Sequence, residues 1–337
     1  MNINKVVGAT KVQSENDFVV DQETFTSGIV VTPENIKFDG RIRNAMYRDV
    51  NILRHRTQNT DQYQHLFSER NTLGDCTKHL PLNGIVITNK GKIKDYVVHY
   101  GTGENFGALR HYEIPLYIEI APYSNVNLHE SFWKDSFKRI MKIVYVLREG
   151  ATLNLHRTFK TAKCSSLQII ESDFIQHPTS VLNIETKSLG PVDYLQDLYF
   201  VTAYKYTTTN ITNRYKVTNQ DSVHVITDVK HIGPGSVSNT DVKSITDDNG
   251  KFTFSGNIIV DKVAENVDAN LQNKNLQLSE TSTVVTEPKL DIATKEIACK
   301  HGCTVSSVDP EQLYLLNTRG FDNIQAKEIL TEAFING

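Results

Sequence analysis

The sequence predicts an all-β body that ends in a helical hairpin, and three observations support this fold class. In the middle of the chain, apolar residues alternate with polar ones over short runs, as at Leu153 and Leu155 or at Val223 and Val225. Turn signals such as Gly233–Gly235 and Asp248–Gly250 separate these runs. Two helical patterns with capping residues then close the chain. A β-sandwich and a β-solenoid both fit this pattern, and no fixed-length repeat decides between them.

The first 140 residues form a region of mixed pattern. Leu82 to Val98 is expected to form a hairpin around Asn89–Gly91, and Leu116 to Ile120 a further strand. Trp133 and its aromatic neighbours Phe132 and Phe137 indicate a short helix that packs in the core. We therefore expect this region to be distinct from the β-rich body.

The C-terminal segment predicts two helices. Asp309 is expected to be an N-cap, with Pro310 at the first helical position and Gln312 completing a capping box, so that a helix runs from Pro310 to Thr318 and ends before Gly320. Asp322 and Gln325 predict the cap of a second helix. The apolar stripe of that helix, which more often packs inside a protein than it binds a partner, consists of Ala326, Ile329, Leu330 and Phe334.

A short run before these helices carries possible metal ligands. If Glu296–Val305 is extended, Cys299, His301 and Cys303 point to one side, because alternate residues of a strand share a face. Thiolate and imidazole suit zinc, copper(I) or the iron of a cluster. Two cysteines facing inward as inert packing residues are the simpler interpretation of the spacing.

Several blocks of sequence resemble the SufB/SufD family, the scaffold subunits of the SUF iron–sulfur cluster assembly system. The similarity covers the chain from about Phe254 to Phe334, and a weaker match reaches back to about Ile143. The blocks are Phe254–Val260, Gln272–Ser279, Pro288–Ile292, Cys299–Gly302, Glu311–Leu315 and Arg319–Gly320. The resemblance implies a right-handed parallel β-helix with a short C-terminal helical hairpin. It divides the chain into an N-terminal region (1–140), a β-helix core (141–306) and a helical segment (307–337).

The resemblance is to the D-type subunit rather than the B-type. B-type members are similar at Gln272 but continue with a cysteine where this chain has Asn273, and they carry Glu-His-Glu where this chain has Lys300–Gly302. The resemblance implies that His301, and then Cys299, contribute to a nascent iron–sulfur cluster at a subunit interface. Cys303 is a third candidate from its place on the same face, and the resemblance gives it no role. Cys303 stands where the family usually has alanine. We expect no cluster bound tightly to the isolated chain and no enzymatic activity of its own.

The same resemblance implies two partners. One is a SufB-type subunit at the end of the β-helix, and the other is a SufC-type ABC ATPase at the C-terminal helices, where the candidate contacts are Tyr314, Arg319, Leu330 and Phe334. A homodimer through the β-helix is a further expectation. Compared with its relatives, we expect the chain to be shortened at both ends.

Composition excludes several other classes of function. The net charge of -3 over 337 residues provides no basic field for nucleic acid. No apolar run is long enough for a signal peptide or a membrane span, so we expect a cytoplasmic protein. The four cysteines, which include Cys76 and Cys164, do not indicate a disulfide framework. Gly101–Gly107 lacks the spacing of a dinucleotide-binding loop, and the chain has no phosphate-binding loop for ATP.

Two alternative functions remain open. Parallel β-helices include polysaccharide-cleaving enzymes, but these need carboxylates held on one strand face, and the adjacent Asp247 and Asp248 are better interpreted as turn residues. The chain could also be a structural solenoid of this family without cluster chemistry. His231 matches a family histidine, and we expect it to bond between coils rather than to bind metal.

Overall fold

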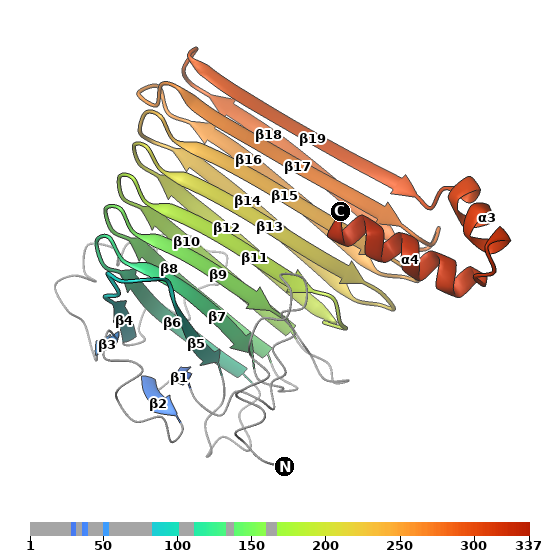
Figure 1. Cartoon of the computed structure of the whole chain (residues 1–337), viewed down its shortest axis with the longest axis horizontal. Helices are drawn as coiled ribbons and strands as arrows, with labels where there is room; N and C mark the ends of the chain where they lie inside the picture. The colour runs from blue at the N-terminus through green and yellow to red at the C-terminus, as the bar shows by residue number, and fades with distance from the viewer. Residues whose placement is uncertain are drawn as a thin grey trace.

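The computed structural model describes residues 28–31, 36–39, 50–53, 83–100, 111–132, 138–159 and 167–337. Two parallel sheets face each other in this part of the chain, and the polypeptide passes from one sheet to the other once in each half-turn, as Figure 1 shows. Sheet A has the strand order β19-β17-β15-β13-β11-β9-β7-β5-β1-β2, and sheet B has the order β18-β16-β14-β12-β10-β8-β6-β4-β3. The prediction of a parallel β-helix with two C-terminal helices is therefore confirmed, and the sandwich is excluded.

From β4 onward, successive strands alternate between sheet B and sheet A, whereas β1 with β2 and β3 with β4 form antiparallel pairs within one sheet. Sheet A contains β1 (Gly28–Val31), β2 (Ile36–Asp39), β5 (Lys94–Tyr100), β7 (Asn125–Phe132), β9 (Thr152–Thr158), β11 (Val181–Ser188), β13 (Thr208–Val217), β15 (Val237–Thr246), β17 (Val267–Gln277) and β19 (Ile297–Ser307). Sheet B contains β3 (Val50–Leu53), β4 (Asn83–Ile87), β6 (His111–Ile120), β8 (Lys138–Leu147), β10 (Leu167–Gln176), β12 (Tyr194–Ala203), β14 (Ser222–His231), β16 (Lys251–Val260) and β18 (Thr283–Ile292). The helices are α3 (Pro310–Thr318) and α4 (Asn323–Asn336).

Alternation of side chains fills the space between the two sheets. In β11, Leu182 and Ile184 are buried, whereas Asn183 and Glu185 lie on the outer face. Strands β13 and β14 repeat this pattern. The inward residues of successive rungs pack into one continuous apolar core, as expected for a solenoid in which each rung contacts its neighbours.

The rungs differ in length, which explains why no fixed repeat is visible in the sequence. Side chains that bond between equivalent positions are 27 residues apart for Asn210 and Asn183, 29 for Asn183 and Asn154, and 31 for Ser244 and Asn275. Turns of different length account for these unequal spacings. The outward asparagines form a ladder of side-chain bonds across five rungs, from Asn127 to Asn239.

Two of the predicted turns require glycine for a steric reason. A Cβ atom on Gly250 would come within 2.4 Å of the carbonyl oxygen of Val217 in the preceding rung. Gly235 has φ +67°, in the left-handed region, and a Cβ there would meet the ring of Tyr206. Close stacking of the rungs therefore depends on glycine at these corners.

The N-terminal half corrects two expectations. Residues 83–98 do not form the expected hairpin, because β4 belongs to sheet B, beside β3 and β6, whereas β5 belongs to sheet A, beside β1 and β7. The turn at Asn89 passes between the sheets instead of folding one strand back on the other. The stacked strands also begin well before residue 141, and the strand predicted at Leu116 is part of β6. Trp133, Phe137, Cys76, Cys164 and Gly101–Gly107 lie outside the described residues.

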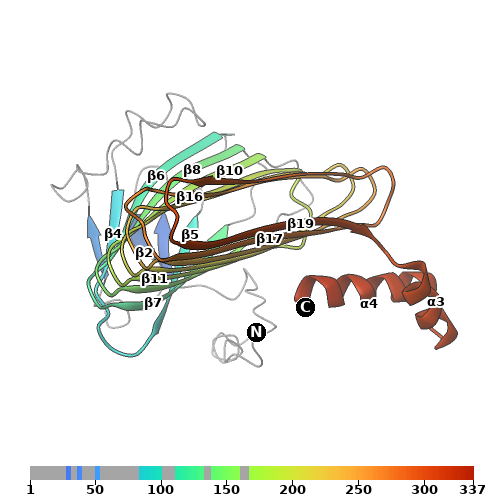
Figure 2. The same ribbon diagram turned by 90° about the horizontal axis from the view of Figure 1, so that it is seen from above.

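The helical hairpin packs beside the last rungs. Viewed from above in Figure 2, α4 lies along the outer side of the sheet that contains β11, β17 and β19. Ile335 packs against Ile245 and Leu276, and Arg214 and Lys243 donate to the carbonyl oxygens of Ile335 and Phe334. No helix among the described residues is long and apolar enough to cross a membrane.

Candidate functional site

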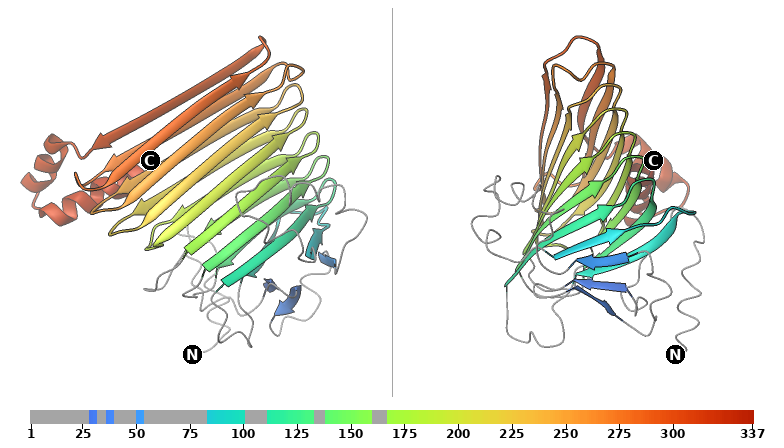
Figure 3. Two further views of the ribbon diagram at one scale, coloured as in Figure 1. Left: turned by 180° about the vertical axis from the view of Figure 1, so that it is seen from behind. Right: turned by 90° about the vertical axis from the view of Figure 1, so that its left-hand side faces the viewer.

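The solenoid ends at an uncovered rung. Strands β18 and β19 are the last members of sheets B and A, and no described strand lies beyond them, as both views in Figure 3 show. Each strand therefore has one edge whose backbone groups are not paired in the described part of the chain, an arrangement that favours pairing with another strand. The inward side chains of this rung have core on one side only.

Register with the preceding rung places the predicted ligands on the inward face of β19. Cys299, His301 and Cys303 pair with Ala269, Leu271 and Asn273 of β17, all of which are buried. Because β19 has no following rung, His301 is exposed, and both cysteines are half-buried. The three side chains therefore share one face at the mouth of the solenoid, as the alternation predicts, and His301 does not lie in the dry interior.

The two thiols occupy different surroundings. Cys299 packs against the apolar core. Burial raises the pKa of its thiol, and the nearby charge of Asp268 raises it further. The Sγ atom of Cys303 instead lies 2.8 Å from the hydroxyl of Thr286 and 3.7 Å from Oδ1 of Asn273.

The polar surroundings of Cys303 continue into the interior. Thr286 donates to Oδ1 of Asn273 at 2.8 Å, and the amide of Asn275 donates to the same oxygen at 2.6 Å. Asn273, which stands where the B-type pattern has a cysteine, is the partner of Cys303 in the preceding rung. A small polar cluster connects strands of both sheets at the open end.

The opposite side of the mouth is apolar. Leu290 and Ile292 of β18 pair with the buried Ile258 and Val260 of the preceding rung, yet each is 38 % exposed. They are inward-facing residues that lack the next rung. The end of the solenoid therefore combines exposed apolar side chains with an imidazole and a thiol.

The site does not form a complete metal centre by itself. Among the described residues, no group of three or more histidine, cysteine, aspartate or glutamate side chains is arranged to hold a metal ion. Residues two apart on a strand are separated by about 7 Å, so a row of three spreads over about 13 Å. One ion can use two adjacent members of the row at most, and its other ligands must come from elsewhere.

The candidate partner contacts of the helical hairpin differ in exposure. Tyr314 is 71 % exposed, and Arg319 is exposed as well. Leu330 and Phe334 are half-buried, and Phe334 packs on the outer face of sheet A beneath the amine of Lys243. Asp309 caps α3 by accepting from the amide of Glu311, without the capping box expected from Gln312. Asp322 and Gln325 form the capping box that the sequence predicts on α4.

His231 lies inside the solenoid, away from the open end. Its side chain is fully buried, and its two ring nitrogens bond to the hydroxyls of Ser236 at 2.7 Å and Ser238 at 2.9 Å. Burial lowers its pKa to about 4. These bonds join the end of β14 to the turn and strand that follow, so the residue has a structural role in the corner.

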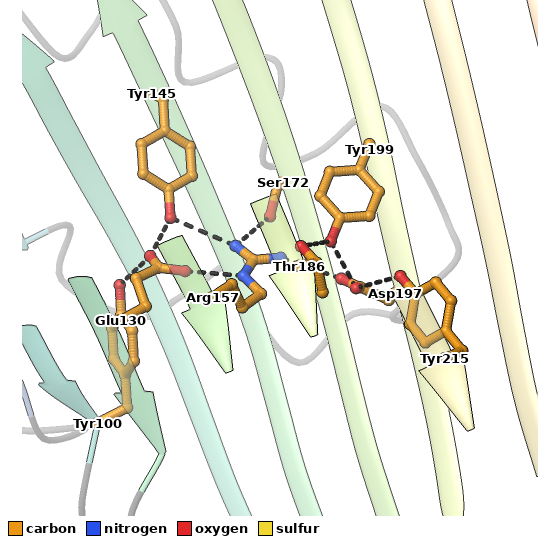
Figure 4. Close-up of polar contacts among 9 residues, drawn as sticks. All are labelled: Tyr100, Glu130, Tyr145, Arg157, Ser172, Thr186, Asp197, Tyr199 and Tyr215. Atoms are coloured by element: carbon orange, nitrogen blue, oxygen red, sulfur yellow. Dashed lines mark hydrogen bonds and ion pairs between the residues drawn. The ribbon is translucent and has the colours of Figure 1, made fainter. Parts of the chain in front are cut away.

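A buried charge network is the feature that sequence reasoning missed. Figure 4 shows Arg157 between Glu130 and Asp197, with Nε 2.7 Å from Oε2 of Glu130 and Nη1 3.0 Å from Oδ1 of Asp197. Four tyrosine hydroxyls donate further hydrogen bonds to these carboxylates. Those of Tyr100 and Tyr145 donate to Glu130, and those of Tyr199 and Tyr215 donate to Asp197. The sequence does contain a sign of this network, because Arg157 continues the alternation of Leu153 and Leu155 and therefore faces inward.

The carboxylates considered for sugar cleavage are turn residues. Asp248 has φ 52°, and its side chain accepts a bond from the amide of Asn219 at 3.2 Å. Oδ1 of Asp247 accepts a bond from the amide of Asp248 at 2.9 Å. The two groups therefore fix a corner of the solenoid rather than face a common site.

Known proteins with a similar sequence fit this geometry. Residues 104–334 match the family described as SUF system FeS cluster assembly, SufBD core domain. The chain is 35% identical over 92 residues to the iron–sulfur cluster assembly protein SufD of Escherichia coli, a match that covers 27% of this chain and 22% of the relative. It is 32% identical over 105 residues to SufB of Bacillus subtilis, covering 31% and 23%.

A SufBD family protein of Synechocystis is 32% identical over 101 residues, which covers 30% of this chain and 22% of the relative. The matches thus span less than a quarter of the length of each of these relatives. They include both SufD and SufB, so they do not separate the two types. The family match extends over more than half of the chain, and the chain belongs to the SufBD core family of the SUF iron–sulfur cluster assembly system.

Proposed function

We propose that this protein is a SufD-like scaffold subunit that helps to build a nascent iron–sulfur cluster at its interface with a SufB-type subunit. The observation that carries the proposal is the exposed His301 on the inward face of the uncovered last rung. Imidazole can replace thiolate on cluster iron. A ligand held at an open end, rather than inside the chain, is suited to a site shared by two proteins.

The incomplete ligand set supports a shared site. His301 and a neighbouring thiol provide two ligands at most, and no described group provides three. Asn273 is a buried, hydrogen-bonded amide, so this chain offers no thiol at the position of the B-type cysteine. The sulfur-accepting cysteine would then belong to the partner, and the cluster would remain a transient product of the complex.

The open end also provides the contact surface for the partner. Strands β18 and β19 each have one edge that no described strand pairs with, and Leu290 and Ile292 offer apolar area that a second solenoid would bury. The same features permit a homodimer. A SufC-type ATPase would bind the helical hairpin through Tyr314 and Arg319, with Leu330 at the margin, whereas Phe334 holds α4 on sheet A. We place this assembly in the cytoplasm, where thiols stay reduced.

Coexpression with SufB-type and SufC-type subunits tests the proposal. The complex should be reconstituted anaerobically, with iron and sulfide measured per complex and its size determined. His301→Ala should lower the cluster yield while the complex stays assembled, because the side chain lies at the interface without filling the core. His224→Ala, which changes a half-buried outward histidine of β14, is the matched control.

Two results would contradict the proposal. An unchanged cluster yield for His301→Ala removes the imidazole from the mechanism. Failure of the chain to join a SufB-type subunit favours the second candidate, a structural solenoid, which is consistent with the lack of a described three-ligand group.

A further inference from the structure

We propose that Cys303 is the thiol that binds iron together with His301, and that Cys299 is a packing residue. The proposal refines the proposed function by naming the ligand pair on this side of the interface. It places Cys303 before Cys299, the reverse of the order expected from the sequence. The argument rests on what each sulfur contacts.

Cys303 lies in surroundings that suit a bound thiolate. Its Sγ is 2.8 Å from the hydroxyl of Thr286. When the thiol is ionised, this hydroxyl can turn its one proton from Oδ1 of Asn273 to the sulfur, because the amide of Asn275 still donates to that oxygen. Oδ1 of Asn273, 3.7 Å from Sγ, accepts a bond from the neutral thiol and is itself held by the amide of Asn275. Hydrogen-bonding groups behind a metal ligand orient it and tune its affinity.

Cys299 lies in the opposite kind of surroundings. It is one of three partly buried apolar residues that pack against the main core, together with Val284 and Ile297. Cysteine in such a place behaves as a small hydrophobic residue. Turning its sulfur toward a metal at the mouth would withdraw it from these contacts.

The spacing of His301 and Cys303 allows both to reach one ion. Alternate residues on a strand lie about 7 Å apart, and metal bonds of about 2.0–2.3 Å to nitrogen and sulfur can converge between them. On binding, the Cys303 thiol releases its proton to solvent, and a sulfur–iron bond forms. The Fe²⁺ ion keeps its oxidation state, and solvent or the partner supplies the remaining ligands.

Titration with Co²⁺, an optical substitute for Fe²⁺, tests this assignment on the full chain alone. The background variant Cys76→Ser/Cys164→Ser removes the other two thiols, and wild type is titrated in parallel under anaerobic conditions. We expect a thiolate-to-cobalt absorption band that Cys303→Ser abolishes and Cys299→Ser retains. His301→Gln should weaken the apparent affinity about tenfold or more, because even groups behind a ligand contribute that much.

Thermal unfolding gives a second reading that does not depend on metal. Cys299→Ser should lower the melting temperature, since it places a hydroxyl against the apolar core, whereas Cys303→Ser should leave the temperature nearly unchanged. Retention of the cobalt band in Cys303→Ser, or its loss in a folded Cys299→Ser protein, overturns the assignment. Because the titration uses no partner, this outcome is separate from a failure to assemble with a SufB-type subunit.

Discussion

At the scale of single residues, the interior of the solenoid contains buried charged side chains that stabilise one another. Arg157, Glu130 and Asp197 are all buried, and the ion pairs join neighbouring strands of sheet A to β12 of sheet B. Burial raises the pKa of the Asp197 carboxyl, and the hydroxyls of Tyr199 and Tyr215 oppose this by donating to its ionised form. The network is stable only while each charge retains its partners.

We expect Arg157→Met to lower the free energy of unfolding by about 3–5 kcal/mol, because it leaves two buried carboxylates without their cation. Denaturant unfolding followed by circular dichroism measures the loss. Lys187→Met is the control, since Lys187 pairs with Glu185 near the surface and should contribute about 1 kcal/mol or less. Equal effects of the two substitutions would falsify the account of the interior network.

His231 predicts a dependence of stability on pH. Its pKa of about 4 in the folded state lies below the ordinary 6.5 of an unfolded chain, so the folded protein disfavours its charged form. Its contribution is therefore complete above pH 6.5 and is lost as the pH falls toward 4, by about 3 kcal/mol in total. His231→Gln, which can still bond to the serines, should flatten the fall of unfolding free energy between pH 7 and pH 4.5. A slope that matches wild type would contradict the assignment.

At the scale of elements, α4 is attached to the solenoid through its C-terminal half. In this half Thr331 and Ile335 are buried, and Arg214 and Lys243 bond to carbonyls at the end of the helix. Positive side chains at a helix C-terminus also favour the helix dipole. In contrast, α3 buries none of its side chains. Thus α4 anchors the hairpin to the solenoid, and α3 leaves its side chains accessible.

Ile335→Ala should loosen α4 from sheet A. We expect a loss of about 2 kcal/mol, at the low end for a core isoleucine because the site lies at the edge of its cluster. Hydrogen exchange should become faster in residues 323–336 and stay unchanged in the rungs. Ile324→Ala, on the same helix at a side chain that is 72 % exposed, should leave exchange and stability nearly unaltered. Faster exchange throughout the solenoid would show that α4 is not an independent attachment.

At the scale of the whole molecule, the solenoid is a stack with one unfinished end. Every rung from β5 to β17 lies between two others, but β18 and β19 have a neighbour on one side only among the described strands. Stacked proteins are stabilised by contacts between adjacent repeats, so an uncovered terminal repeat lacks half of them. Association through this end would restore those contacts.

Leu290→Glu should therefore weaken association of the protein with a SufB-type subunit and with itself, because a charge replaces apolar area that the contact would bury. Sedimentation velocity on each mixture measures the change. Leu189→Glu is the control, since Leu189 is 45 % exposed in the corner between β11 and β12, several rungs from the open end. Association that survives Leu290→Glu would place the interface elsewhere.

Much of the fold could be predicted from particular residues. Alternation at Leu153 and Val223 correctly predicted buried strand faces, and Asp309 and Asp322 correctly marked the starts of both helices. The expected hairpin at residues 82–98 was wrong, because a turn signal does not show whether the chain returns to the same sheet. The ladder from Asn127 to Asn239 was visible only once its unequal spacing was known.

The sequence by itself determined which side chains face inward, where the helices begin, and that Cys299, His301 and Cys303 share a face, since these follow from local periodicity and capping. The tertiary structure alone decided that His301 is exposed, that Cys303 meets Thr286, and that Arg157 lies between two carboxylates. Those contacts join residues on different strands. Their register depends on turn lengths that vary from rung to rung, and no local pattern of polarity encodes that variation.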